Sequence, residues 1–98
     1  MLLNDYDDRK IKLSLTKAEK IMALLNQWDP AGEYKSSGDY RVYSFEAESI
    51  ADSIRTNSSV ASVEKAVREA MEVVMEGKAF DDNELHQMAG YILAAIKR

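Results

Sequence analysis

Histidine and clustered carboxylates are the side chains that would carry metal or acid–base chemistry, and this chain arranges few of them in a useful pattern. His86 is the only histidine, and it lies near Asp81, Asp82 and Glu84. These neighbours suggest a metal ligand or a general base. A catalytic zinc ion, however, takes three protein ligands, often several histidines. The three acids are explained by a helix N-terminus, where negative charge is favourable. We therefore predict a solvated histidine and no metal site.

Other catalytic patterns are missing from the sequence. Asp5, Asp7 and Asp8 form an acidic run, but it lacks the glycine and the distant glutamate of a calcium loop. The chain contains no cysteine, which excludes a thiolate nucleophile and a sulfur-ligated metal. There is no phosphate-binding glycine loop, GxSxG or HExxH, and a Ser-His-Asp set would have to use His86. These observations predict a protein that is not an enzyme and that uses no cofactor.

Aromatic side chains among carboxylates are better candidates, and the chemistry they indicate is binding. Tyr and Trp are enriched in binding hot spots because they bury a large area and keep a polar tip. Trp28 and Tyr43 fit apolar helical stripes and are predicted to close the core, whereas the other tyrosines of this region fit less well. An aromatic patch rimmed with carboxylates would suit a basic protein surface, and a merely solvated acidic face is the alternative. The residues predicted to bind a partner are Glu33, Tyr34, Asp39, Tyr40, Glu46, Glu48, Asp52, Glu69 and Glu72.

Two predicted helices would position the first of these residues. The sequence TKAE from Thr16 is a capping box, and the helix that it starts ends before Pro30, because a proline disfavours the helical region for the residue that precedes it. Residues 31–39 are predicted to be a loop. A second helix begins between residues 39 and 44, and the polar run at residues 56–59 ends it.

Two more helices follow in the second half of the chain. One runs from about residue 60 to 76, with Gly77 at the place of a left-handed C-cap. The other follows Asp81, which forms a second capping box with Glu84. Val73 and Met75 lie outside the main apolar stripe of the third helix, so this helix is central in the bundle or meets a second copy in a homodimer.

Four amphipathic helices joined by short loops can bury their apolar stripes only against one another. The fold is therefore predicted to be all-α, a compact antiparallel bundle of four helices in a single domain over residues 16–98. Residues 1–15 are predicted to be an N-terminal arm. Alternating apolar residues at 11, 13 and 15 favour an extended arm packed on the helices or the first part of the first helix. A strand that pairs with residues 40–45 is the competing interpretation.

The composition is typical of one soluble globular domain. The 98 residues include 13 basic and 17 acidic side chains, which gives a net charge of −4. The basic residues are scattered, so nucleic acid is not an expected partner. No apolar run approaches the roughly 20 residues that span a bilayer, and the N-terminus mixes acids with bases, unlike a signal peptide. We therefore expect a cytoplasmic protein without a membrane partner.

The sequence IMALLNQWDP at residues 21–30 resembles the opening helix of a family of small bacterial all-helical domains of unknown function. In that family an apolar helix ends in Trp-Asp-Pro, and a loop and an acidic helix of the type YSFEAESI, here residues 43–50, follow it. Two further amphipathic helices complete the pattern, which residues 16–97 match in order. The resemblance implies an all-α fold and no particular activity.

A second resemblance is one of type. Small, acidic, cysteine-free helical domains are similar to bacterial immunity proteins, which bind and block toxin domains, many of them basic nucleases. The function expected from this resemblance is a non-enzymatic, immunity- or antitoxin-like inhibitor that binds a basic partner protein through an acidic, Tyr-bearing surface. The alternative is a structural helical module that associates with itself.

Overall fold

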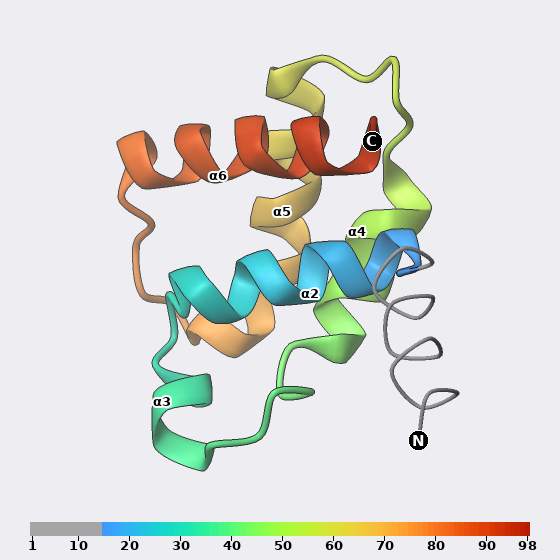
Figure 1. Cartoon of the computed structure of the whole chain (residues 1–98). Coiled ribbons are helices and arrows are strands. Elements are labelled where there is room, and N and C mark those ends of the chain that lie inside the picture. The colour runs from blue at the N-terminus through green and yellow to red at the C-terminus, as the bar shows by residue number, and fades with distance from the viewer. Residues whose placement is uncertain (1–14) are drawn as a thin grey trace, which may run out of the picture.

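The computed structural model describes residues 15–98, which form a compact all-α globule (Figure 1). The described residues before the first helix are in coil, and the rest of the predicted arm, residues 1–14, lies outside the described part. The competing strand at residues 40–45 is wrong, because residues 40–43 form a turn that leads into a helix. Residues 15–98 contain no strand and five helices, α2 (Lys17–Trp28), α3 (Glu33–Ser37), α4 (Ser44–Ser53), α5 (Val60–Met75) and α6 (Asp82–Ile96).

The four longer helices enclose one core. Helix α2 packs against α4 and α6, and α5 packs against the same two helices. Figure 1 shows α2 and α6 running in opposite directions, whereas α5 crosses behind them, so the four helices do not all lie antiparallel as predicted. None of the helices among residues 15–98 combines the length and the apolar character needed to cross a bilayer.

The core is built from the apolar stripes that helical spacing predicts. Its fully enclosed side chains come from every long helix and include Ile21, Leu25, Ala47, Ile50, Val63, Val67, Met71, Leu85, Ala89 and Ile92. Tyr43 is also fully enclosed, as predicted, and Trp28 is half-buried against the core. Met75 is buried, which corrects the expectation that it is left over, whereas Val73 is 85% exposed.

Local capping determines where α2 begins. The hydroxyl of Thr16 accepts a hydrogen bond from the Glu19 backbone N–H at 3.1 Å, and the Glu19 carboxylate accepts one from the Thr16 backbone N–H at 2.9 Å. The predicted capping box is therefore confirmed. The bond from the Thr16 backbone is the main reason why the pKa of Glu19 lies below its ordinary value.

The turn between α5 and α6 differs from the prediction in two details. Asp81 caps α6 by accepting from the backbone N–H groups of Asn83 and Glu84. The Glu84 carboxylate does not return a bond to Asp81; it accepts one from Trp28 Nε1 at 3.1 Å and so ties the end of α2 to α6. The left-handed turn after α5 begins at Glu76, with φ 52°, one residue before Gly77.

We expect the replacement Ile50→Ala to lower the free energy of unfolding by about 2–5 kcal/mol, because the fully enclosed side chain leaves a cavity. Urea denaturation measures this change. The neighbouring exposed replacement Ser49→Ala is the control and should change stability by less than about 0.5 kcal/mol. Equal stability of the two variants would contradict the described core.

Candidate functional site

One carboxylate organises the segment between α2 and α4. Asp29 ends α2 in the left-handed region, with φ 47°, and its backbone N–H donates to the Leu25 carbonyl at 2.7 Å. Asp29 Oδ1 accepts from the Tyr43 hydroxyl at 2.6 Å and from the Tyr34 backbone N–H at 2.9 Å. Asp29 Oδ2 accepts from the Lys35 backbone N–H at 3.0 Å. The central residue of the Trp-Asp-Pro sequence is therefore a structural junction between α2, α3 and the start of α4.

This junction explains α3, which corrects the prediction of a loop at residues 31–39. A five-residue helix has little stability of its own, because the first turn costs more conformational entropy than its hydrogen bonds return. The N-cap of α3 is Gly32, which has no side chain to cap the free N–H groups. Asp29 supplies the missing acceptors from outside the helix. The short helix ends at Gly38, whose φ of 72° suits glycine.

The electrostatics of the junction keep Asp29 charged and Tyr43 neutral. Partial burial opposes ionisation of Asp29, but the hydrogen bonds from Tyr43, Lys35 and Tyr34 outweigh it and hold the pKa of Asp29 below its ordinary value. Burial, followed by the hydrogen bond to Asp29, raises the pKa of Tyr43 well above its ordinary value. The tyrosine hydroxyl therefore keeps its proton at neutral pH and donates to Asp29.

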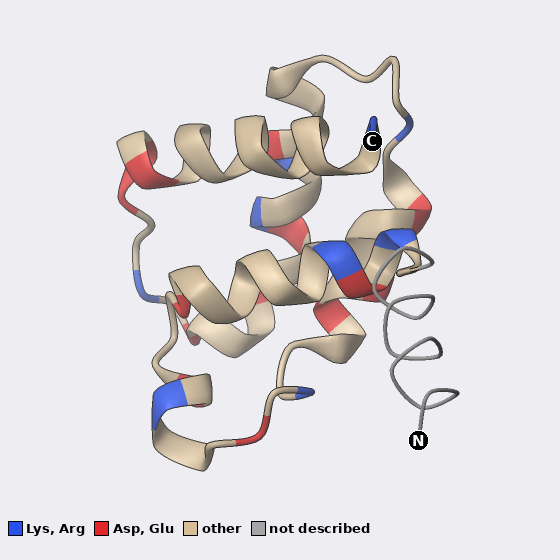
Figure 2. Ribbon diagram, in the orientation of Figure 1, with Lys and Arg blue, Asp and Glu red and all other residues tan. Residues whose placement is uncertain are grey.

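The nine residues predicted to bind a partner do not form one continuous patch. Figure 2 shows acidic residues on several sides of the molecule, with basic residues between them. Eight of the nine are exposed, and Glu46 is half-buried. They fall into three groups, namely Glu33, Tyr34, Asp39 and Tyr40 on α3 and the turn after it, Glu46, Glu48 and Asp52 on α4, and Glu69 and Glu72 on α5.

Of the three groups, the one on helix α4 lies beside an exposed aromatic side chain and contains no basic residue. Phe45 is 81% exposed, and Glu48 and Asp52 follow it at intervals of three and seven residues, so the three side chains share one helical face. Residues 44–53 contain no basic side chain. We call Phe45, Glu48 and Asp52 the α4 face. The α4 face therefore presents one exposed aromatic ring and two exposed carboxylates.

Phe45 is not among the residues predicted to bind a partner, whereas Glu46 is, and both differences follow from the helical phase. Phe45 lies off the stripe formed by Tyr43, Ala47 and Ile50, which was the signal that it points to solvent. Glu46 lies beside that stripe. Its Oε1 atom is enclosed and has no hydrogen-bond partner among the described residues, so it does not belong to the α4 face.

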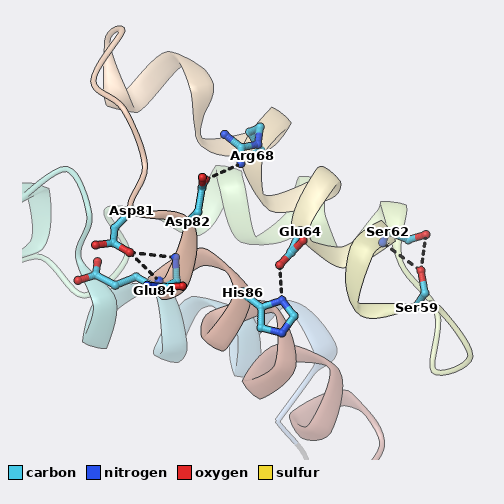
Figure 3. Close-up of polar contacts among 9 residues, drawn as sticks. Ser59, Ser62, Glu64, Arg68, Asp81, Asp82, Glu84 and His86 are labelled. Atoms are coloured by element: carbon cyan, nitrogen blue, oxygen red, sulfur yellow. Dashed lines mark hydrogen bonds and ion pairs between the residues drawn. The ribbon is translucent and has the colours of Figure 1, made fainter.

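The single histidine belongs to a polar row between α5 and α6. Figure 3 shows His86 turned toward Glu64, with Nδ1 and Oε1 2.6 Å apart, and Arg68 turned toward Asp82 at 3.3 Å. The His86 side chain is 69% exposed, which agrees with the predicted solvated histidine. Within the described part of the chain, no three His, Cys, Asp or Glu side chains gather as metal ligands. Exposed pairs of this kind contribute little to stability.

A second surface feature is a groove between α2 and α6. Its volume is about 930 Å³, and Lys20 and Arg98 lie at the end where α2 begins and α6 ends. We call it the α2–α6 groove. Tyr91 and Gln27 lie toward its other end, and each is seven residues from the basic residue on its own side of the groove. Its apolar lining consists of Leu15, Ala23, Leu24, Tyr91, Ala94 and Ala95.

The basic end of this groove continues into a second hollow of about 500 Å³. Lys20 lines both hollows, and Lys17 and Arg55 line the second one. Lys17 also donates a hydrogen bond to the Ile54 carbonyl at the end of α4. Among residues 15–98, no acidic side chain lines either hollow. The described lining of the two hollows is therefore cationic although the chain as a whole is acidic.

Comparison with protein-family models, with curated proteins and with solved structures finds no match to this chain. Its function is therefore inferred from its own surfaces. The α4 face and the α2–α6 groove each bring exposed apolar side chains together with charge of one sign.

We expect Tyr43→Phe to lower the free energy of unfolding by about 1.5–3 kcal/mol, because it removes a hydrogen bond to a charged carboxylate. Urea denaturation at neutral pH measures the loss. Tyr34→Phe removes an exposed hydroxyl and should change stability by less than about 0.5 kcal/mol. If both variants were as stable as the parent, Asp29 would not be the junction described above.

The lowered pKa of Asp29 predicts a specific acid sensitivity. A carboxyl whose folded-state pKa lies below its unfolded-state value stabilises the protein above the unfolded-state value, and this contribution is lost as the pH falls. We expect Asp29→Asn to be less stable than the parent at pH 7 and to approach it from about pH 4 downward. Chemical denaturation at pH values from about 2 to 7, a range that spans the titration of a carboxyl group, tests this prediction. The control is Asp52→Asn, which replaces an exposed carboxylate. If the free energy of unfolding of Asp29→Asn changed with pH in parallel with that of the parent, the prediction would be contradicted.

Proposed function

We propose that this chain is a non-enzymatic protein-binding module that contacts a basic partner through the α4 face. The observation that carries the proposal is the 81% exposure of Phe45 beside Glu48 and Asp52 on a helix that lacks basic residues. Exposed aromatic side chains at the centre of an interface supply much of its binding energy when a partner buries them. The two carboxylates would select a positively charged surface and accelerate its approach.

The residues around the α4 face have a smaller part in this proposal. Tyr40 is 59% exposed in the turn before α4 and is a second exposed aromatic side chain of this part of the sequence. Its backbone carbonyl accepts from Asn26 at 2.7 Å, which ties the turn to α2. The acids of α3 and α5 contribute mainly a long-range field, which salt screens over about 10 Å.

Within this class we propose an inhibitor of the immunity or antitoxin type. The small size, the acidic net charge and the absence of cysteine support this narrower proposal. The mechanism would be steric and electrostatic. The carboxylates of the α4 face would occupy the place of substrate phosphates on a basic toxin domain, and the globule would block access to it.

The test compares proteins retained from cells of the source organism by the immobilised parent chain and by the variant Phe45→Ala, Glu48→Lys, Asp52→Lys. We expect a basic protein to bind the parent with an affinity at least about 100-fold higher than it binds the variant, because three contacts are lost or reversed. Titration of the purified partner at two salt concentrations measures this, and binding should weaken as salt is raised. A retained nuclease should lose its activity when an equimolar amount of the parent chain is added.

The matched control is the α5 variant Val73→Ala, Glu69→Lys, Glu72→Lys. It makes the same kind of change on another exposed face, and Val73 is as exposed as Phe45. We expect this variant to bind the partner within about threefold of the parent, since its charges act only at long range. Equal losses in both variants, or partners that are all acidic, would refute a specific role for the α4 face.

A further inference from the structure

The α4 face and the α2–α6 groove carry charges of opposite sign, and each of them changes from apolar to charged along its length. The α4 face has an aromatic ring at its start and two carboxylates toward its end, at Glu48 and Asp52. The α2–α6 groove has an apolar end near Tyr91 and a cationic end at Lys20 and Arg98. An aromatic ring laid at the apolar end would direct the carboxylates toward the cations.

The two surfaces also match in length. Phe45 and Asp52 are seven residues apart, which is about 10 Å along a helix. Lys20 and Gln27 on α2 are also seven residues apart and bound a stretch of about 10 Å. On the other wall, Tyr91 lies on α6 and Arg98 lies just beyond the end of that helix. The floor between them contains small alanine side chains, which allow another helix to approach closely. A helix in a groove is a common mode of recognition.

From this juxtaposition we infer that a second copy of this chain is an occupant of the groove: the α4 face of one copy docks into the α2–α6 groove of another. This inference rests on the proposed function, because it names a partner for the same α4 face. The cationic, apolar groove has the basic character that the proposal requires of a partner. Phe45 contacts the apolar lining at Leu24 and Tyr91, and Glu48 and Asp52 pair with Lys20 and Arg98.

The contact is heterologous, because it joins two different surfaces. The α4 face belongs to one helix, and the groove belongs to two others, so a single copy offers both surfaces at once. Such contacts add copies until a ring closes. A face of one short helix makes a small interface, which belongs to the weak and reversible class. A second copy in this position covers the α4 face and competes with any other basic partner.

Sedimentation velocity over a range of protein concentrations tests the inference on the full chain. The parent should associate reversibly with a dissociation constant on the order of 100 µM. Phe45→Ala should weaken this association by at least about tenfold. The groove variant Lys20→Glu, Arg98→Glu should abolish it, and the matched control Lys65→Glu, Lys78→Glu, which reverses two cations outside both hollows, should leave it unchanged.

The decisive experiment mixes two variants. Glu48→Lys, Asp52→Lys has a damaged face and an intact groove, and Lys20→Glu, Arg98→Glu has the opposite. Each should be monomeric alone, and the mixture should form a 1:1 dimer, because one intact face meets one intact groove. Ala94→Trp, which fills the groove without a charge change, provides an independent block. Matching circular dichroism melts establish that the variants are folded.

Three outcomes would overturn the inference. The first is a parent chain that is monomeric at about 1 mM, well above the expected dissociation constant. The second is a pair of variants that do not combine. The third is a set of nuclear Overhauser contacts, in the monomer, between residues 11–14 and Leu24 or Tyr91, which would mean that the chain fills its own groove.

These outcomes are independent of the proposed function. The groove variant Lys20→Glu, Arg98→Glu keeps the α4 face intact and should still bind a basic partner from the cell. If it does, while the parent chain fails to self-associate, the proposed function stands and the inference falls. If the parent chain self-associates through the α4 face and no other basic partner is found, the inference stands and the proposed function falls.

Discussion

The hydrogen bonds accepted by the Asp29 carboxylate are the interaction on which the first half of the structure depends. Asp29 stops α2 in a left-handed conformation, receives two backbone N–H groups of α3 and holds the hydroxyl of Tyr43. The bonds share one negative charge, so they are stronger than bonds between neutral groups. Without that charge, Tyr43 would carry an unsatisfied hydroxyl into the core, and α3 would lack a cap.

The junction also determines the orientation of α4. Tyr43 is the residue that precedes α4, and its side chain is fixed in two directions, by the core around the ring and by Asp29 at the hydroxyl. The helical phase then places Ala47 and Ile50 inward and Phe45 outward. The α4 face is therefore a consequence of how α2 ends, and the exposure of an aromatic ring results from the packing of its neighbour two residues earlier.

The sequence predicts the features that depend on neighbours within one helical turn. The caps at Thr16 and Asp81 and the apolar stripes of the four longer helices are of this kind, and the structure confirms them. The features that it did not predict depend on partners farther along the chain. Helix α3 needs the carboxylate of Asp29 as a cap. The Glu84 carboxylate accepts a hydrogen bond from Trp28, which is 56 residues away, instead of completing the capping box. The groove needs two helices from opposite ends of the chain, so no local pattern reveals it.

The placement of polar groups confines chemistry to the surface of the described part of the chain. Among residues 15–98 the fully buried side chains are apolar, apart from the hydroxyl of Tyr43, which is already bonded to Asp29. The half-buried Asn26 and Glu46 each contribute one further enclosed oxygen. Most carboxylates of this part of the chain lie at the surface, in contact with water. Such groups act through their electric field and through the shape of the surface that bears them. An aromatic ring beside them adds exposed apolar area, and this combination is what supports the proposed binding role of α4.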